Sequence, residues 1–143
     1  MNIAFHTENI EMPDIQPDRL KSWIAQVAAT HSKQVGEVNY IFVDDERILQ
    51  INREFLQHDY YTDIITFDYT QAGIICGDLF ISLDTVRTNA ETVEATYSHE
   101  LHRVIIHGIL HLCGINDKGP GEREIMEEAE NKALKLLNIE NQA

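Results

Sequence analysis

The chain has 143 residues, of which 43% are hydrophobic and 24% are charged. This length favours a single domain over residues 1–143, and this balance excludes collagen-like and largely disordered proteins. Eleven Lys and Arg residues against 24 Asp and Glu residues give a net charge of −13, which disfavours general electrostatic binding to nucleic acid but leaves open a local basic cleft.

Hydrophobic periodicity predicts about four strands and five helices in mixed order. The strands are expected over residues 1–6, 38–43, 62–69 and 74–82, with a turn at residues 71–73 joining the last two into a hairpin. The helices are expected to begin at Pro17, at Asp44 or Asp45, at Ser82 or Asp84, at Thr96 or Ser98, and at Pro120. The predicted fold is α/β (α+β): a small mixed four-stranded sheet packed against about five helices.

The fourth predicted helix runs to Cys113 and is apolar on most of its sides, so we expect it to be the buried central helix. Gly114 suits the position just after its end. No segment has the 18 or more apolar residues of a membrane span, and the N-terminus lacks the basic region of a signal peptide. We therefore expect no membrane association and a cytoplasmic location, with Cys76 and Cys113 reduced.

This central helix carries the strongest chemical pattern of the chain. His107 and His111 are four residues apart, so on a helix they lie on one face. Gly114 allows the chain to turn back, and Asp117 then supplies a carboxylate from another direction. Two imidazoles and a carboxylate with an open fourth position predict a catalytic zinc site, although nickel, manganese and iron accept the same ligands. Two hydrogen-bonded histidines without a metal are the alternative.

The spacing H-x-x-x-H-x-x-G-x-x-D is shared with metzincin proteases, which carry a Glu directly after the first His as general base. Here that position is Gly108, which cannot accept a proton. The usual peptidase mechanism therefore lacks its base. His99 and His102 do not have ligand spacing and are interpreted as surface or capping residues.

Three segments resemble one known family. Residues 107–117, HGILHLCGIND, resemble the HGxLHLxGYDH signature of the YbeY family, which are bacterial metal-dependent endoribonucleases linked to ribosomal RNA maturation and ribosome quality control. Residues 52–67, NREFLQHDYYTDIITF, resemble its NxxYRxxxxxTDVLSF segment, and residues 77–81, GDLFI, resemble its GDIxI strand. Met126 and Glu130 match its C-terminal helix. The resemblance covers about residues 38–137 and implies a single α/β domain, one zinc ion and cytoplasmic cleavage of single-stranded RNA.

Two positions depart from the family pattern. Asp117 stands where the family usually has a third His, and Leu56 stands where it usually has an Arg that would face the substrate phosphate. Carboxylate is a good zinc ligand, but its charge makes the metal a weaker Lewis acid. Because leucine cannot neutralise phosphate, Arg53 and Lys118 are the predicted replacements, with solvated surface charges as the alternative interpretation.

The leading interpretation is a zinc-dependent endoribonuclease of single-stranded ribosomal RNA that acts with the ribosome. The first rival is a ribosome-assembly module with a structural metal, because an acidic domain can dock on basic ribosomal proteins. The second is a peptidase-like hydrolase. Asp63 and Asp78 are candidates for orienting a ligand His or for closing turns. His58, Tyr60 and Tyr61 are candidates for stacking on RNA bases or for packing within a loop.

Overall fold

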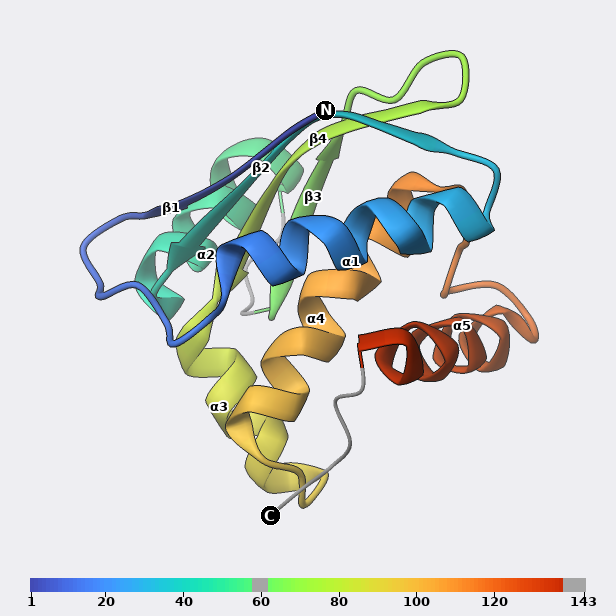
Figure 1. The fold of residues 1–143 in the computed structure, drawn as a ribbon. Coiled ribbons are helices and arrows are strands. Elements are labelled where there is room, and N and C mark those ends of the chain that lie inside the picture. The colour runs from blue at the N-terminus through green and yellow to red at the C-terminus, as the bar shows by residue number, and fades with distance from the viewer. Residues whose placement is uncertain (58–61, 138–143) are drawn as a thin grey trace.

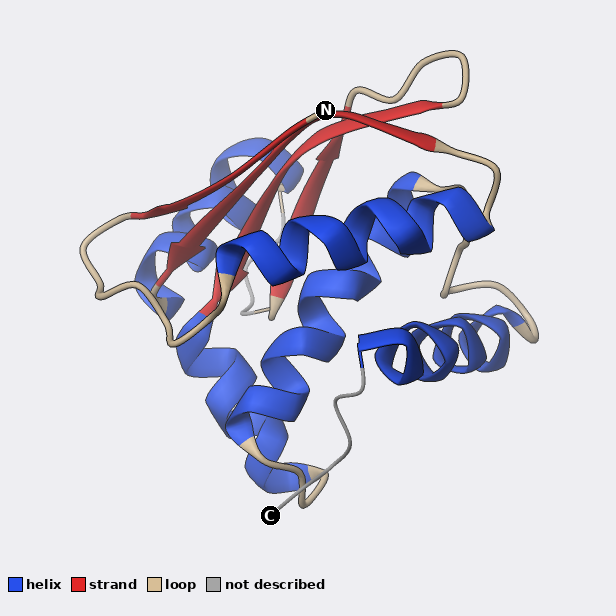
Figure 2. Ribbon diagram, in the orientation of Figure 1, coloured by secondary structure: helices blue, strands red, loops and turns tan. Residues whose placement is uncertain are grey.

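Four strands form one sheet in the order β1-β2-β4-β3. The structure, a computed structural model, describes residues 1–57 and 62–137. β1 (Asn2–Thr7), β2 (Gln34–Val43) and β4 (Ile74–Ser82) are parallel neighbours, and β3 (Ile64–Asp68) pairs antiparallel with β4. The mixed sheet and the hairpin are therefore confirmed (Figures 1 and 2). The predicted stacking residues His58, Tyr60 and Tyr61 lie outside the described residues.

The helices cover the two faces of the sheet unequally (Figure 1). They are α1 (Pro17–Thr30), α2 (Asp45–Ile51), the π-helical segment η1 (Asn52–Leu56), α3 (Leu83–Thr92), α4 (Tyr97–Leu112) and α5 (Glu122–Leu137). The larger core packs α1, α3, α4 and α5 against one face, and the smaller core packs α2 against the other. Alternation along β2 serves both cores, since Tyr40 faces the larger core and Ile41 the smaller one.

Side-chain caps place the starts of three helices where the sequence predicts them. Asp44, Ser82 and Thr96 each accept a hydrogen bond from the backbone N–H three residues later. The last helix starts at Glu122 rather than Pro120, because the intervening Gly121 has a φ of +75° and cannot belong to a right-handed helix. The helix expected from Asp44 or Asp45 was predicted to include Phe55; the structure ends α2 at Ile51 and continues as η1, whose π-helical form was not predicted.

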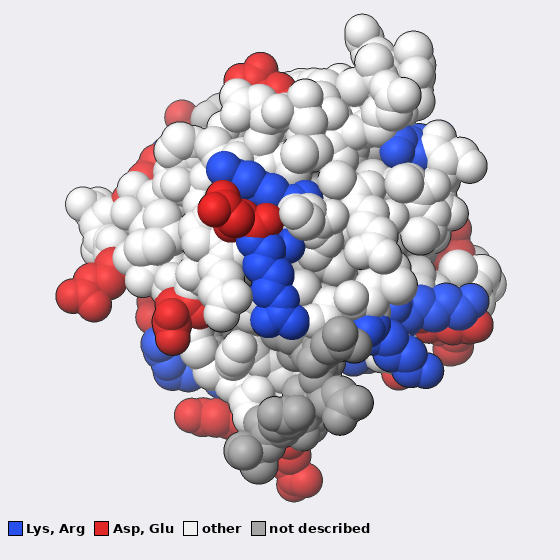
Figure 3. All heavy atoms as spheres, in the orientation of Figure 1, with Lys and Arg blue, Asp and Glu red and all other residues white. Residues whose placement is uncertain are grey.

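The central helix α4 is buried over most of its length, as expected. Tyr40 of β2 is fully buried and donates its hydroxyl hydrogen to the backbone oxygen of Ile105 at 2.8 Å, which joins the sheet to α4. Among the described residues, no helix has the length and apolar character needed to cross a membrane. On the face drawn in Figure 3, acidic and basic side chains are interspersed among neutral ones.

Candidate functional site

His107 and His111 lie on one face of α4. Their rings are stacked, with centroids 6.2 Å apart and planes inclined by 10°. Just after the helix, Gly114 has a φ of +101°, a left-handed conformation that glycine adopts without strain. The chain turns back there, and Oδ2 of Asp117 comes to 3.3 Å from Nε2 of His107. The structure thus brings the carboxylate of Asp117 next to His107.

Both imidazoles are held through Nδ1. Nδ1 of His107 donates to Oε2 of Glu130 on α5 at 2.6 Å, and Nδ1 of His111 donates to the backbone oxygen of Ile115 at 3.2 Å. A carboxylate and a carbonyl oxygen only accept hydrogen bonds, so the proton of each neutral ring lies on Nδ1. Each Nε2 then keeps its lone pair, as a metal-binding histidine requires.

Glu130 is shared between two side chains of α4. It is 8% exposed, and its Oε1 accepts a hydrogen bond from Arg103 at 2.8 Å while Oε2 holds His107. Arg103 also donates to Oδ1 of Asn131 at 2.7 Å. This arrangement fixes the carboxylate from both sides and ties α5 to the histidine face of α4.

The electrostatic surroundings of His107 favour its charged form. Burial is the largest influence and lowers its pKa, but the hydrogen bond and charge of Glu130, with the charges of Asp117 and Asp63, outweigh burial and raise the pKa. Asp63, just before β3, has its pKa raised by burial, and the charge of His107 opposes that shift. The two side chains therefore influence each other through their charges, and no hydrogen bond between them is seen among the described residues.

The donor atoms fit zinc chemically, since two imidazoles and a carboxylate are typical of catalytic zinc sites. In the part of the chain that the structure describes, however, no three His, Cys, Asp or Glu side chains already form an arrangement that would hold a metal ion.

A cavity of about 620 Å³ opens beside His107, between α4 and α5. Its wall carries four carboxylates and two guanidinium groups: Glu100, Asp117, Glu127 and Glu130, with Arg103 and Arg123. Burial is the main cause of the raised pKa of Glu100, and Arg103 opposes the shift. Because the wall carries more negative than positive groups, it repels a phosphate that enters the cavity unless a cation accompanies that phosphate.

Arg53 and Lys118, the predicted phosphate-binding residues, are both exposed. Arg53 lies on η1, and Lys118 lies in the loop between α4 and α5. Within residues 1–57 and 62–137, neither belongs to the residues that line the cavity. The two arginines on the cavity wall, Arg103 and Arg123, were not predicted, because neither has a recognisable spacing to the histidines.

Gly108 faces the sheet rather than the cavity. A Cβ atom at this position would overlap a methyl group of Leu79 on β4 and approach a methyl group of Ile64 to 3.0 Å. A glutamate at position 108 would therefore clash with the core. This packing weakens the peptidase alternative further, because the position of the protease base is closed.

The interpretation of His102 as a surface or capping residue is wrong. Its side chain is 7% exposed and packs against Trp23 of α1, with ring centroids 6.2 Å apart. Its Nδ1 donates to the backbone oxygen of Ser98 at 2.6 Å. His102 is therefore a core histidine whose polar atom is satisfied within its own helix.

Known proteins resemble the chain along nearly all of its length. The model of the family described as Endoribonuclease YbeY matches residues 2–138. Proteins named Endoribonuclease YbeY from Phocaeicola vulgatus and Bacteroides thetaiotaomicron are each 66% identical, over 96% and 95% of this chain and 99% of their own. The solution structure of TM1509 from Thermotoga maritima superposes with a TM-score of 0.67 at 28% identity, covering 94% of this chain and 88% of that one. The chain therefore belongs to the YbeY family of endoribonucleases.

Proposed function

We propose that the protein is a zinc-dependent endoribonuclease that cleaves single-stranded RNA in the cytoplasm. Its substrate in this proposal is ribosomal RNA, and its role is ribosomal RNA maturation and ribosome quality control. Membership of the YbeY family supports an RNA-cleaving activity. The metal, the type of RNA and the association with the ribosome are parts of the proposal.

One observation carries the proposal. The neighbouring His107 and His111 are both bonded through Nδ1, so in the neutral rings both Nε2 atoms keep a lone pair, and Oδ2 of Asp117 lies 3.3 Å from Nε2 of His107. These three residues are the proposed zinc ligands. Zinc bound there would polarise a phosphoryl oxygen and activate water.

The surrounding residues have distinct proposed roles. Glu130 and the carbonyl of Ile115 keep the two rings in the metal-binding tautomer. Arg53 and Lys118, both exposed, are proposed to neutralise phosphate groups of a bound strand outside the cavity. Because Gly108 supplies no base, we expect slow turnover with either water or the RNA 2′-hydroxyl as the attacking group.

Cleavage of an end-labelled single-stranded RNA tests this proposal. The protein is stripped of metal and assayed before and after one equivalent of zinc is added, beside His111→Ala prepared in the same way. We expect cleavage only with zinc, and none by the variant. Arg53→Ala and Lys118→Ala are expected to cleave more slowly; if both cleave at the normal rate, their proposed role is wrong.

The acidic wall of the cavity also suits the rival function, a ribosome-assembly module that holds a structural metal. Zinc binding at one equivalent without any RNA cleavage would overturn the nuclease and favour that module. Digestion of casein by the zinc-loaded protein would instead favour a peptidase.

A further inference from the structure

The two arginines on the cavity wall differ in what they contact. Arg103 is engaged on both sides, by Oε1 of Glu130 at 2.8 Å and by Oδ1 of Asn131 at 2.7 Å. Arg123 lines the same cavity, and its side chain is exposed. Among residues 1–57 and 62–137 it has no hydrogen-bond or ion-pair partner. Its guanidinium group is thus available to a ligand, whereas that of Arg103 is committed to the protein.

Arg123 lies on the same side of α5 as Glu130, which holds His107. It lies in the first turn of α5, and Glu127 and Glu130 follow it by four and seven residues on the same side of that helix. The seven-residue interval is about 10 Å along the helix axis. Arg123 therefore lies about two helical turns from Glu130, on the wall of the same cavity.

The charge of the cavity makes such an arginine chemically significant. Four carboxylates on the wall oppose the approach of a polyanion, and the other arginine there is already paired. A free guanidinium group offers a planar set of donors that matches two phosphate oxygens. It also attracts the phosphate at long range, which the remainder of the wall does not.

We propose that Arg123 binds a backbone phosphate of single-stranded RNA beside the histidine site and so positions the strand in the cavity. The ligand is the RNA phosphodiester, recognised without regard to base. This inference rests on the proposed function for its substrate, but it concerns binding and is therefore measurable apart from cleavage. It assigns the positioning role to a residue on the wall of the cavity, in addition to the exposed Arg53 and Lys118.

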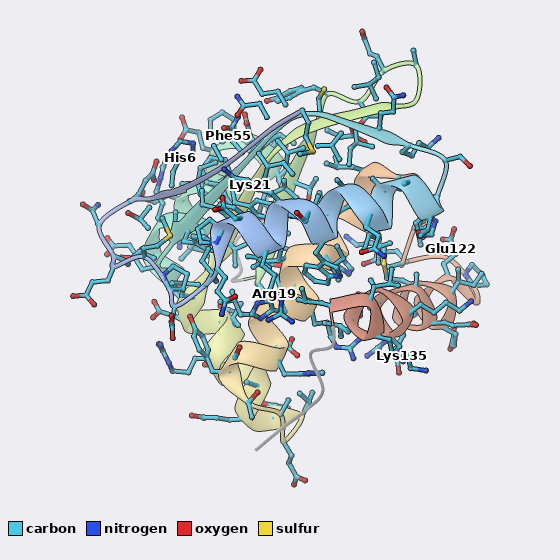
Figure 4. All side chains as sticks on the ribbon, in the orientation of Figure 1. His6, Arg19, Lys21, Phe55, Glu122 and Lys135 are labelled. Atoms are coloured by element: carbon cyan, nitrogen blue, oxygen red, sulfur yellow. The ribbon has the colours of Figure 1, made fainter. Side chains whose placement is uncertain are left out.

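The test measures binding of a fluorescent single-stranded oligoribonucleotide to the zinc-loaded protein over a range of salt concentrations. Each measurement is completed in a time shorter than the expected slow turnover, and a gel verifies that the RNA is still intact. Arg123→Ala is compared with Arg123→Lys. The matched control is Lys135→Ala, which removes one exposed positive charge from the same helix. Lys135 lies near the other end of α5 from Glu122 (Figure 4) and is outside the cavity wall.

We expect Arg123→Ala to bind about tenfold more weakly, as is typical when a hydrogen bond to a charged group is lost. The slope of log affinity against log salt should become shallower by about 0.7, the value for one phosphate contact on a single strand. Arg123→Lys should keep the slope but recover only part of the affinity. In cleavage assays, the substitution should raise KM more than it lowers kcat.

The outcomes separate this inference from the proposed nuclease. In one outcome the unmodified protein cleaves RNA, and Arg123→Ala and Lys135→Ala bind RNA with equal affinity and equal salt slope. That outcome would overturn the role of Arg123 but not the proposed nuclease. Binding that depends on Arg123 without any cleavage would overturn the nuclease alone. Absence of both binding and cleavage would overturn both.

Discussion

Glu130 accepts a hydrogen bond from Nδ1 of His107 at 2.6 Å across the interface between α5 and α4. The other carboxylate oxygen of Glu130 is held by Arg103 at 2.8 Å. Because both oxygens are engaged, the carboxylate has little freedom to rotate. The orientation of the His107 ring is therefore set by a helix that begins after the histidine motif has ended.

Replacing Glu130 with Gln should weaken zinc binding by about 10- to 100-fold, the usual effect of losing the partner of a ligand histidine. The carboxylate of Glu130 orients the ring of His107 and, through its negative charge, makes Nε2 a stronger ligand. The amide of Gln lacks that charge. Competition for zinc with a coloured chelator measures the change.

The matched control for this prediction is Glu124→Gln, which removes the charge of an exposed residue on the same helix. Circular dichroism of both variants verifies that the helices are intact. Equal zinc affinities for Glu130→Gln and the unmodified protein, with both folded, would show that Glu130 does not support a metal ligand.

Gly108→Ala should destabilise the protein by about 1–3 kcal/mol, the usual cost of overpacking a core. The added methyl group would overlap Leu79 and approach Ile64, so β4 and α4 would have to separate. Urea denaturation measures the free energy of unfolding. If space is the cause, Leu79→Ala should be less harmful in the Gly108→Ala background than alone; additive effects would exclude this explanation.

The arrangement of the elements was largely predictable because it follows from local patterns. Alternation predicts the strands, capping side chains predict helix starts at Asp44, Ser82 and Thr96, and the interval of four residues places His107 and His111 on one face. These features need only neighbouring residues and the geometry of a helix or strand.

Contacts between distant segments were not predictable in this way. Arg103 and Glu130 are 27 residues apart, and only the packing of α5 on α4 brings them together. The resemblance to the YbeY family singled out Glu130, but no spacing in the sequence indicated that Arg103 is its partner. His102 was misjudged for the same reason, because its burial depends on Trp23, which lies in a helix far earlier in the chain.

Tyr40→Phe should lower the free energy of unfolding by about 1 kcal/mol, the usual net value of one hydrogen bond. The substitution leaves the ring in the core and removes only the hydroxyl that bonds to the backbone oxygen of Ile105. Tyr69→Phe serves as the control, since Tyr69 is 58% exposed. Equal effects of the two substitutions in urea denaturation would argue against a stabilising role for the bond between β2 and α4.

His102 should make the protein less stable as the pH falls. Burial is the main cause of its lowered pKa; the charges of Arg19 and His99 lower it further, and the bond to Ser98 opposes them. Below pH 6.5, the ordinary pKa of histidine, His102 is protonated in the unfolded chain but stays neutral in the folded chain. The free energy of unfolding therefore falls with the pH until the pH passes the lowered pKa of His102 in the folded protein. His102→Gln should therefore lose less stability than the unmodified protein between pH 7.5 and about pH 5.

Comparison of the variants is necessary because His107 acts in the opposite direction. Its raised pKa stabilises the fold below the ordinary value of 6.5, and this contribution is lost as the pH rises through the folded pKa. Both His102→Gln and the unmodified protein contain His107, so its contribution cancels when the pH dependence of one is subtracted from that of the other. His6→Gln is the control, since His6 is an exposed residue of β1 (Figure 4). If His6→Gln and His102→Gln change the pH dependence of unfolding equally, the burial of His102 has no energetic consequence in this range.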